Sequence, residues 1–190
     1  MPALFPPWSN HALRLVLVLV MLFALATVTL PMIYVRTPFA TEKDFEHEQP
    51  VAFDHRHHVL DDGIACLYCH SGAERSPAAG VPGTDVCMGC HAQIWNDTPL
   101  LAPVRQSAAT GTPLRWDRVH ALADFVYFDH SVHVRGGIDC ARCHGPVESM
   151  ARVRRVHAFT MDFCLDCHRH PPARPTARMS ALTTCSACHR

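Results

Sequence analysis

The chain has 190 residues, which is enough for one domain of ordinary size and an appended segment. Its 17 lysines and arginines balance 17 aspartates and glutamates, so charge indicates neither nucleic acid nor a strongly acidic molecule as a partner. Ten cysteines and fifteen histidines are the departure from ordinary composition, and any function has to account for them.

An uncharged apolar run, LVLVLVMLFALATVTLPMIYV, occupies residues 15–35 between Arg14 and Arg36. It is long enough to cross the hydrocarbon core of a bilayer as a helix. A cleaved signal peptide is the alternative, because residues 24–26 resemble a cleavage site. The apolar run continues well past that site, so we expect residues 1–36 to be an uncleaved membrane anchor with a transmembrane helix at about 15–35.

A polar, acidic stalk is expected at residues 37–50, followed by a domain at residues 51–190 that holds every cysteine. In a secreted protein of this size, ten cysteines would first suggest five disulfides. Each cysteine, however, belongs to a copy of Cys-x-x-Cys-His, and none is left over. The pairs are Cys66 and Cys69, Cys87 and Cys90, Cys140 and Cys143, Cys164 and Cys167, and Cys185 and Cys188.

Cys-x-x-Cys-His is the attachment signature of c-type haem. The two cysteines form thioethers with one porphyrin, and the adjacent histidine becomes the first axial ligand of the iron. A redox dithiol or half of a zinc site could explain a single copy, but zinc uses such pairs two at a time and needs no histidine after each. Five complete copies predict five covalently bound haem c groups, with the proximal ligands His70, His91, His144, His168 and His189.

The motifs fall into a two-haem module at residues 51–95 and a three-haem module at residues 116–190, joined by a linker at residues 96–115. Fifteen prolines and nine glycines predict little regular secondary structure. About 30 residues per haem are too few to build an apolar core. We therefore expect a mainly α and irregular multihaem fold, with short helices and loops wrapped around five haems, that does not form without them.

Each module opens with the element Phe-Asp-His-x-x-His, at residues 53–58 and 128–133. Histidines three residues apart leave one face of a helix with their Cβ atoms about 5–6 Å apart. They cannot both bind the iron of one haem, because a motif histidine already holds one axial position, so they must serve two different haems. His57 is not expected to be a ligand, because Val132 holds the matching place in the second copy. The distal ligands predicted from this repeat are His55, His58, His130 and His133.

The fifth distal ligand is expected to be His120, which lies in an apolar segment that leads into the second repeat. Methionine is the alternative ligand, and it would raise the potential of its haem relative to a bis-histidine site. Met150 and Met161 lie near motifs, so each stays open as a distal ligand.

Four stretches of the domain resemble the multihaem subunit of bacterial quinol-oxidising membrane complexes. They are QPVAFDHRHHVLDDGIACLYCH at 49–70, VPGTDVCMGCH at 81–91, WDRVHALADFVYFDHSVHVRGGIDCARCHGPVESM at 116–150 and CLDCHRHP at 164–171. The family that the chain resembles is the pentahaem, membrane-anchored cytochrome c subunit of alternative complex III. That family is related to the multihaem subunit of the quinone reductase complex and to class III multihaem cytochromes.

The resemblance implies an electron-transfer subunit of a respiratory or photosynthetic complex, not an enzyme. It would take electrons from an iron–sulfur, molybdopterin-like subunit and pass them to a monohaem cytochrome, a terminal oxidase or another periplasmic acceptor. Quinol oxidation would take place in separate membrane subunits. Because bacteria attach c-type haem outside the cytoplasmic membrane, we expect a single-pass protein with its haem domain on the periplasmic side. The family's distal histidines are matched by His55, His58, His120, His130 and His133.

Two other functions stay open at this point. One is a free-standing, membrane-anchored multihaem quinol dehydrogenase that feeds periplasmic reductases. The other is a multihaem enzyme of the nitrite or hydroxylamine reductase type, which would need one haem with an open coordination position and a modified attachment motif. Five regular motifs and enough distal histidines disfavour the enzyme.

Overall fold

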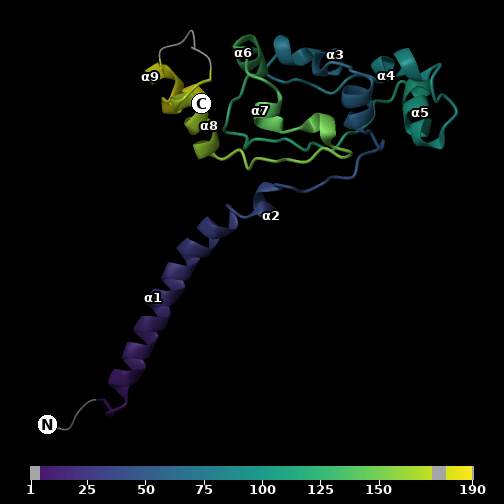
Figure 1. Ribbon diagram of the computed structural model, residues 1–190. Coiled ribbons are helices and arrows are strands. Elements are labelled where there is room, and N and C mark those ends of the chain that lie inside the picture. The colour runs from purple at the N-terminus through teal and green to yellow at the C-terminus, as the bar shows by residue number, and fades with distance from the viewer. Residues whose placement is uncertain (1–4, 173–178, 190) are drawn as a thin grey trace. The chain divides into compact units, whose positions relative to one another are not determined.

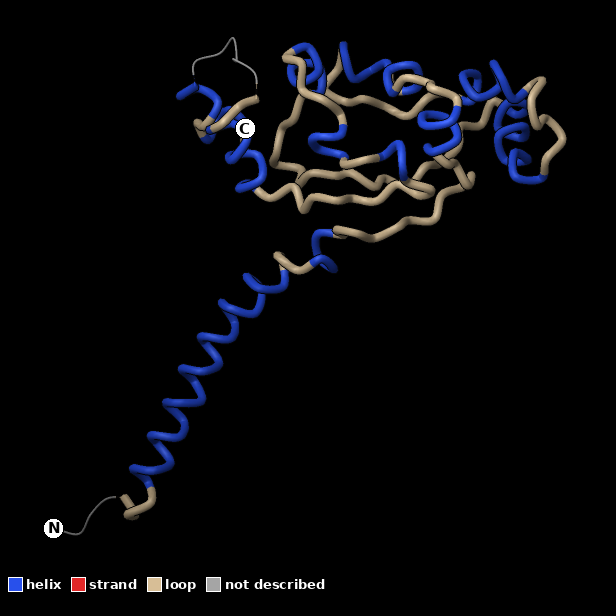
Figure 2. Tube along the Cα trace, viewed as in Figure 1, coloured by secondary structure: helices blue, strands red, loops and turns tan. Residues whose placement is uncertain are grey.

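The computed structural model describes residues 5–172 and 179–189, and in these ranges the chain forms helices and no strands (Figure 2). Most helices are one or two turns long, which confirms the expected mainly α and irregular fold. The helices are α1 Ser9–Tyr34, α2 Pro38–Thr41, η1 Arg56–Asp61, α3 Cys66–Cys69, η2 Ser71–Glu74, α4 Thr84–His91, η3 Pro99–Leu101, α5 Ala102–Thr110, α6 His130–Arg135, α7 Ala141–His144, η4 Val147–Ser149, α8 Met161–Arg169, α9 Met179–Leu182 and α10 Cys185–Cys188.

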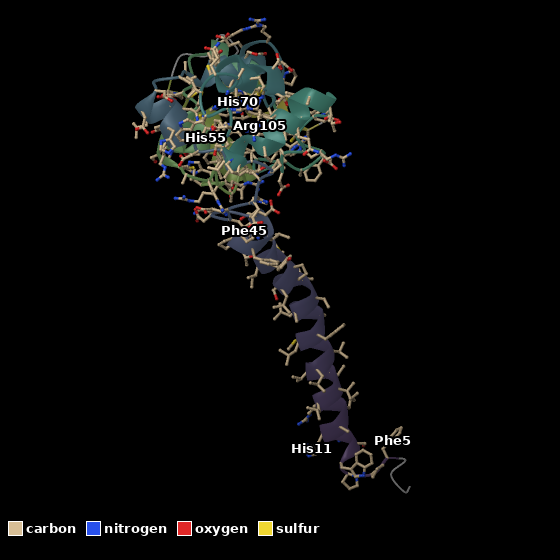
Figure 3. The ribbon with its side chains drawn as sticks, turned by 90° about the vertical axis from the view of Figure 1, so that its right-hand side faces the viewer. Phe5, His11, Phe45, His55, His70 and Arg105 are labelled. Carbon is tan, nitrogen blue, oxygen red and sulfur yellow. The ribbon has the colours of Figure 1, made fainter. Side chains whose placement is uncertain are left out.

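The helix α1 belongs to the first of two compact units, which covers Met1–Thr41. It is longer than expected, because it begins six residues before the apolar run, and it continues through Pro31. Its mean hydropathy reaches 2.6 over an 18-residue window, and no part of that window is buried within the protein. Its side chains point outward on all sides (Figure 3). The helix α1 is long and apolar enough to cross a membrane. A signal sequence near the N-terminus can have the same length and composition.

The second unit, Glu42–Arg190, contains all five motifs and is called the motif domain below. Part of the expected stalk belongs to it. The backbone N–H of Asp44 donates to the carbonyl of Arg155 at 2.7 Å, and Glu46 pairs with Arg154 in an isolated bridge. The motif domain therefore begins with a segment that lies along residues 154–155.

The motif domain has almost no apolar core of its own. Among the described residues, only Val51, Ala73, Val104 and Met150 are buried hydrophobic residues. A soluble domain of about 150 residues ordinarily buries about 70% of the surface that its unfolded chain exposes. The interior of this domain must therefore be completed by something other than its side chains.

The expected linker at residues 96–115 contains the short helices η3 and α5, and α5 packs against α4 (Figure 1). The contact includes a hydrogen bond of 2.6 Å between the hydroxyls of Thr84 and Ser107, while Val104 is only 2% exposed. This segment thus covers the helix of the second motif.

Candidate haem sites

Each motif folds as a helical turn that brings its two cysteines to one side. In the first, third and fifth motifs the backbone N–H of the histidine donates to the carbonyl of the first cysteine at 2.9–3.0 Å. The second and fourth motifs lie inside the longer helices α4 and α8. None of the ten cysteines forms a disulfide, which leaves all the thiols available for thioether bonds.

The two Phe-Asp-His-x-x-His elements adopt closely similar local geometry. Phe53 stacks on His58 with ring centroids 4.3 Å apart, and Phe128 stacks on His133 at 4.4 Å. The first histidine of each pair meets the same phenylalanine edge-on, at 4.7 and 4.8 Å. One aromatic ring therefore orients both histidines of each element, a role that the sequence did not predict although each copy carries the phenylalanine.

The two elements differ in the number of residues that follow them. Four residues lie between His58 and Gly63, whereas three lie between His133 and Gly137, the glycine at the matching position. The helix η1 of the first element is a π-helix, in which the N–H of Asp62 donates to the carbonyl of His57 at 2.9 Å. The matching α6 is an α-helix, in which the N–H of Gly136 donates to the carbonyl of Val132 at 3.0 Å. A π-turn accommodates a one-residue insertion within a helix, so the spacing of the histidines is preserved.

Seven of the ten predicted ligand histidines use Nδ1 in the same way. In each, Nδ1–H donates to a backbone carbonyl, which fixes the tautomer and leaves the Nε2 lone pair for a metal. The pairs are His58 to Asp54 (2.9 Å), His70 to Gly80 (2.8 Å), His91 to Ile94 (3.1 Å), His130 to Pro77 (2.7 Å), His133 to Asp129 (2.8 Å), His168 to Leu182 (2.8 Å) and His189 to Phe125 (3.2 Å).

Predicted proximal and distal histidines come together in pairs. Their ring centroids are 6.1 Å apart for His58 and His91, 6.3 Å for His130 and His144, and 6.1 Å for His133 and His168. Metal–imidazole bonds are about 2 Å long, so one metal atom bound between two imidazoles separates their centroids by about 6 Å. Three of the five predicted sites thus have the spacing of a bis-histidine iron site.

His55 and His70 are also neighbours in the motif domain, and Figure 3 labels both. Burial and then the charge of His70 lower the pKa of His55 to about 4. Burial is also the main reason that the pKa of His144 falls to about 4. Both imidazoles are therefore neutral at pH 7, which is the form that binds a metal.

His120 lies beside the third motif. Its ring centroid is 4.4 Å from that of His144, too close for one iron between them, and its buried Nε2 has no hydrogen-bond partner. Burial, together with the charge of His144, lowers the pKa of His120 to about 3. Of the two predicted alternatives, Met150 is 3% exposed and Met161 is 65% exposed.

Histidines that were not predicted to be ligands have different surroundings. Nδ1 of His47 lies 2.8 Å from Asp117, and Nδ1 of His57 lies 2.9 Å from Asp61, so both meet carboxylates. The His57 side chain is 62% exposed. His57, which was not expected to be a ligand, thus has a carboxylate partner, whereas seven predicted ligands have backbone carbonyls as partners.

The residues present fit covalently bound haem. The motif domain lacks an apolar core, its thiols are unpaired, and the Nε2 atom of His120 is buried without a partner. In the described part of the chain no three His, Cys, Asp or Glu side chains converge as a zinc cluster requires. Two histidines together can supply both axial ligands of a haem iron.

The last third of the chain is similar to a known protein family. Residues 126–190 match the family described as cytochrome c7 and related cytochrome c. The match covers the second repeat and the last three motifs. This part of the chain, in its mainly helical and irregular fold, is therefore similar to the cytochrome c7 family.

A more particular similarity is to the multihaem cytochrome c subunit of menaquinone reductase from Nitratidesulfovibrio vulgaris. The two sequences are 35% identical over 100 residues, which are 52% of this chain and 47% of the relative. The matched chain thus spans about half the length of that relative. The similarity indicates homology to a multihaem cytochrome c subunit of a menaquinone reductase.

Proposed function

We propose that this chain is the pentahaem electron-transfer subunit of a membrane-bound quinol-oxidising complex, of the alternative complex III kind. The observation that carries the proposal is the set of imidazole pairs at 6.1–6.3 Å, each joining a predicted proximal ligand to a predicted distal one. Two strong axial ligands leave no open position for a substrate, so the chain itself is a carrier and not an enzyme.

The motif cysteines hold five haem c groups, and each motif histidine is a proximal ligand. Distal ligands are His55 at the first site, His58 at the second, His130 at the third and His133 at the fourth. The remaining candidates for a distal ligand are His120, which lies beside His144 of the third motif, the buried Met150 and the exposed Met161, and the site where His189 is proximal takes its ligand from among them. Bound haem iron supplies reversible one-electron oxidation and reduction.

The helix α1 anchors the chain in the bacterial cytoplasmic membrane as a single span, with the motif domain on the periplasmic side. Electrons come from an iron–sulfur, molybdopterin-like subunit, while separate membrane subunits oxidise quinol. They leave to a monohaem cytochrome, a terminal oxidase or another periplasmic acceptor. The length and hydropathy of α1 and the resemblance of residues 49–171 support this assignment.

Two alternatives remain. The first alternative is that electrons flow in the reverse direction, toward menaquinone. The name of the relative, a subunit of menaquinone reductase, is the observation in its favour. A free-standing anchored quinol dehydrogenase would need a quinol site in this chain itself.

Purification in mild detergent tests the proposal. We expect the intact mass to exceed that of the polypeptide by five haems, the chain to co-purify with other subunits, and quinol to reduce its haems only in that complex. A lone polypeptide that quinol reduces would contradict the proposal. Reduction of menaquinone by the complex, with no quinol oxidation, would support the reverse direction.

A further inference from the structure

We infer that the five haem sites form one unbranched series, in the spatial order second, first, third, fourth and fifth. The inference rests on the proposed function, since it takes the five motifs as five haem sites. The order differs from the order of the motifs in the sequence. It follows from contacts between residues that the chain brings together from different motifs.

The first and second sites are neighbours because one helix serves both. His58, within η1, lies 6.1 Å from His91 of the second motif, measured between ring centroids. His55, the residue at the start of η1, is close enough to His70 of the first motif for their charges to interact. The two histidines are three positions apart in the sequence, so the two sites cannot be far apart.

The third and fourth sites are joined in the same way by α6. His130 lies 6.3 Å from His144 of the third motif, and the two rings are parallel to within 7°. His133 lies 6.1 Å from His168 of the fourth motif. Each Phe-Asp-His-x-x-His element therefore spans two neighbouring sites.

Contacts between the two modules are concentrated at the first and third sites. Both the N–H and the Nδ1 of His130 donate to the carbonyl of Pro77, in the loop that follows the first motif, and Nε of Arg135 donates to the carbonyl of Glu74. In return, η1 of the first module packs against η4, which directly follows the third motif. These reciprocal contacts bring the first site beside the third.

The fifth site follows the fourth. The helix α9 packs against α8, and Nδ1 of His168 donates to the carbonyl of Leu182 at 2.8 Å, three residues before the fifth motif begins. The N–H of Tyr127 donates to the carbonyl of Cys188, so the fifth motif also adjoins the start of the second repeat. No described hydrogen bond or ring contact joins it to the first module.

Thiol neighbours follow the same order. Thiols that belong to different motifs lie close enough for their charges to interact. The neighbouring thiols are Cys69 and Cys87, Cys66 and Cys140, Cys143 and Cys167, and Cys164 and Cys188. They join the first site to the second, the first to the third, the third to the fourth, and the fourth to the fifth.

Figure 1 shows the same sequence of elements along the motif domain. The helices α5 and α4 lie at one end, α3 and α7 lie between, and α8 and α9 lie at the other end. The second and fifth sites are therefore the two ends of the series. Electrons enter at one end and leave at the other, and the covering helix α5 belongs to the end formed by the second site.

Diffraction at the iron absorption edge, from crystals of the haem-loaded full chain in detergent, tests the order. Each iron is assigned to its motif through the thioether bonds and the motif histidine. We expect the nearest irons to the first site to be those of the second and third sites, and the nearest iron to the fifth to be that of the fourth.

An iron of the second site adjacent to the third or fourth, or a fifth iron adjacent to the first, would overturn the order while leaving five haem sites in place. Fewer than five thioether-linked haems would instead contradict the proposed function, and the series with it.

Discussion

At the scale of single residues, the partner of Nδ1 distinguishes the proposed ligand histidines from the others. Seven of them donate Nδ1–H to a backbone carbonyl, whereas His47 and His57 meet carboxylates. A hydrogen bond from Nδ1–H to a backbone carbonyl fixes the tautomer of the imidazole and leaves its Nε2 free to bind a metal. The repeat predicted four distal histidines, but the carbonyl partners depend on the tertiary fold and could not be predicted from sequence.

Replacing His58 or His133 with alanine should leave all five haems attached but convert one of them to the high-spin state. Attachment depends on the cysteines, whereas the spin state depends on the second axial ligand. Electron paramagnetic resonance measures the change, and intact mass counts the haems. His57→Ala is the matched control, one residue from His58, and should stay fully low-spin. Fully low-spin spectra of both ligand variants would refute the assignment of distal ligands.

Arg155 is a second residue whose role emerges only from the fold. It is 7% exposed, its Nη2 donates to the carbonyl of Val119 at 3.0 Å, and its guanidinium lies 5.9 Å from the ring centroid of Phe159. Phe159 in turn contacts the rings of His120 and His144. A buried positive charge near a haem disfavours the oxidised iron, because the oxidised form carries one more positive charge.

We therefore expect Arg155→Gln to lower the reduction potential of one haem, the one held by His144. Spectroscopic redox titration measures the shift. Arg154→Gln is the matched control, because its neighbouring side chain is 40% exposed and meets the exposed Glu46. An unchanged titration of the Arg155 variant, or equal shifts in both, would exclude this role.

At the scale of elements, the sequence predicted the motif turns and the two histidine elements but not the helix α5. That segment, residues 96–115, was expected to be a linker because it contains no motif. Its ends do carry helix signals, with a proline in the first turn and Gly111 after the last residue at φ 68°. The π-helical form of η1 follows from the extra residue in the first repeat, a difference that the sequence contains but whose geometry it did not specify.

The residue that follows α7, Gly145, has a backbone conformation and surroundings that favour glycine over any other residue. Gly145 has φ 73° and ψ −167°, a region open essentially to glycine alone, and a Cβ there would lie 2.6 Å from Cγ2 of Val156. Gly145→Ala should therefore destabilise the haem-loaded protein by more than about 2 kcal/mol.

Gly111→Ala is the control for that substitution, because Gly111 also has positive φ but has no atom within 4 Å of an added Cβ. It should cost only about 1–2 kcal/mol. Chemical denaturation followed in the haem absorption band compares the two variants. Equal losses in the free energy of unfolding for the two variants would mean that the added Cβ at position 145 does not clash with Val156.

At the scale of the whole molecule, the motif domain consists of short helices and loops and has almost no apolar core of its own. The expectation that it does not fold without haem came from composition, and the four buried hydrophobic residues of the described chain agree with it. The spatial order of the sites could not be predicted, because contacts such as that between His130 and Pro77 join residues far apart in the sequence. The spacing of the motifs along the sequence carries no information about such contacts.

Chain produced without haem attachment should consequently lack a stable motif domain. We expect its circular dichroism in detergent to show helix at about the level of the 26-residue α1, and amides of residues 42–190 to exchange rapidly. The haem-loaded chain is the control. Slowly exchanging amides throughout the haem-free domain would show that the polypeptide folds by itself.

The five proposed haems, each with two strong axial ligands, are expected to carry electrons without chemistry on a substrate. Quantitative electron paramagnetic resonance of the oxidised, haem-loaded protein tests this expectation most directly. We expect five low-spin ferric haems per chain and no stoichiometric high-spin signal. A high-spin signal equivalent to one haem per chain would contradict it, because that haem would have an open position at which a substrate could bind.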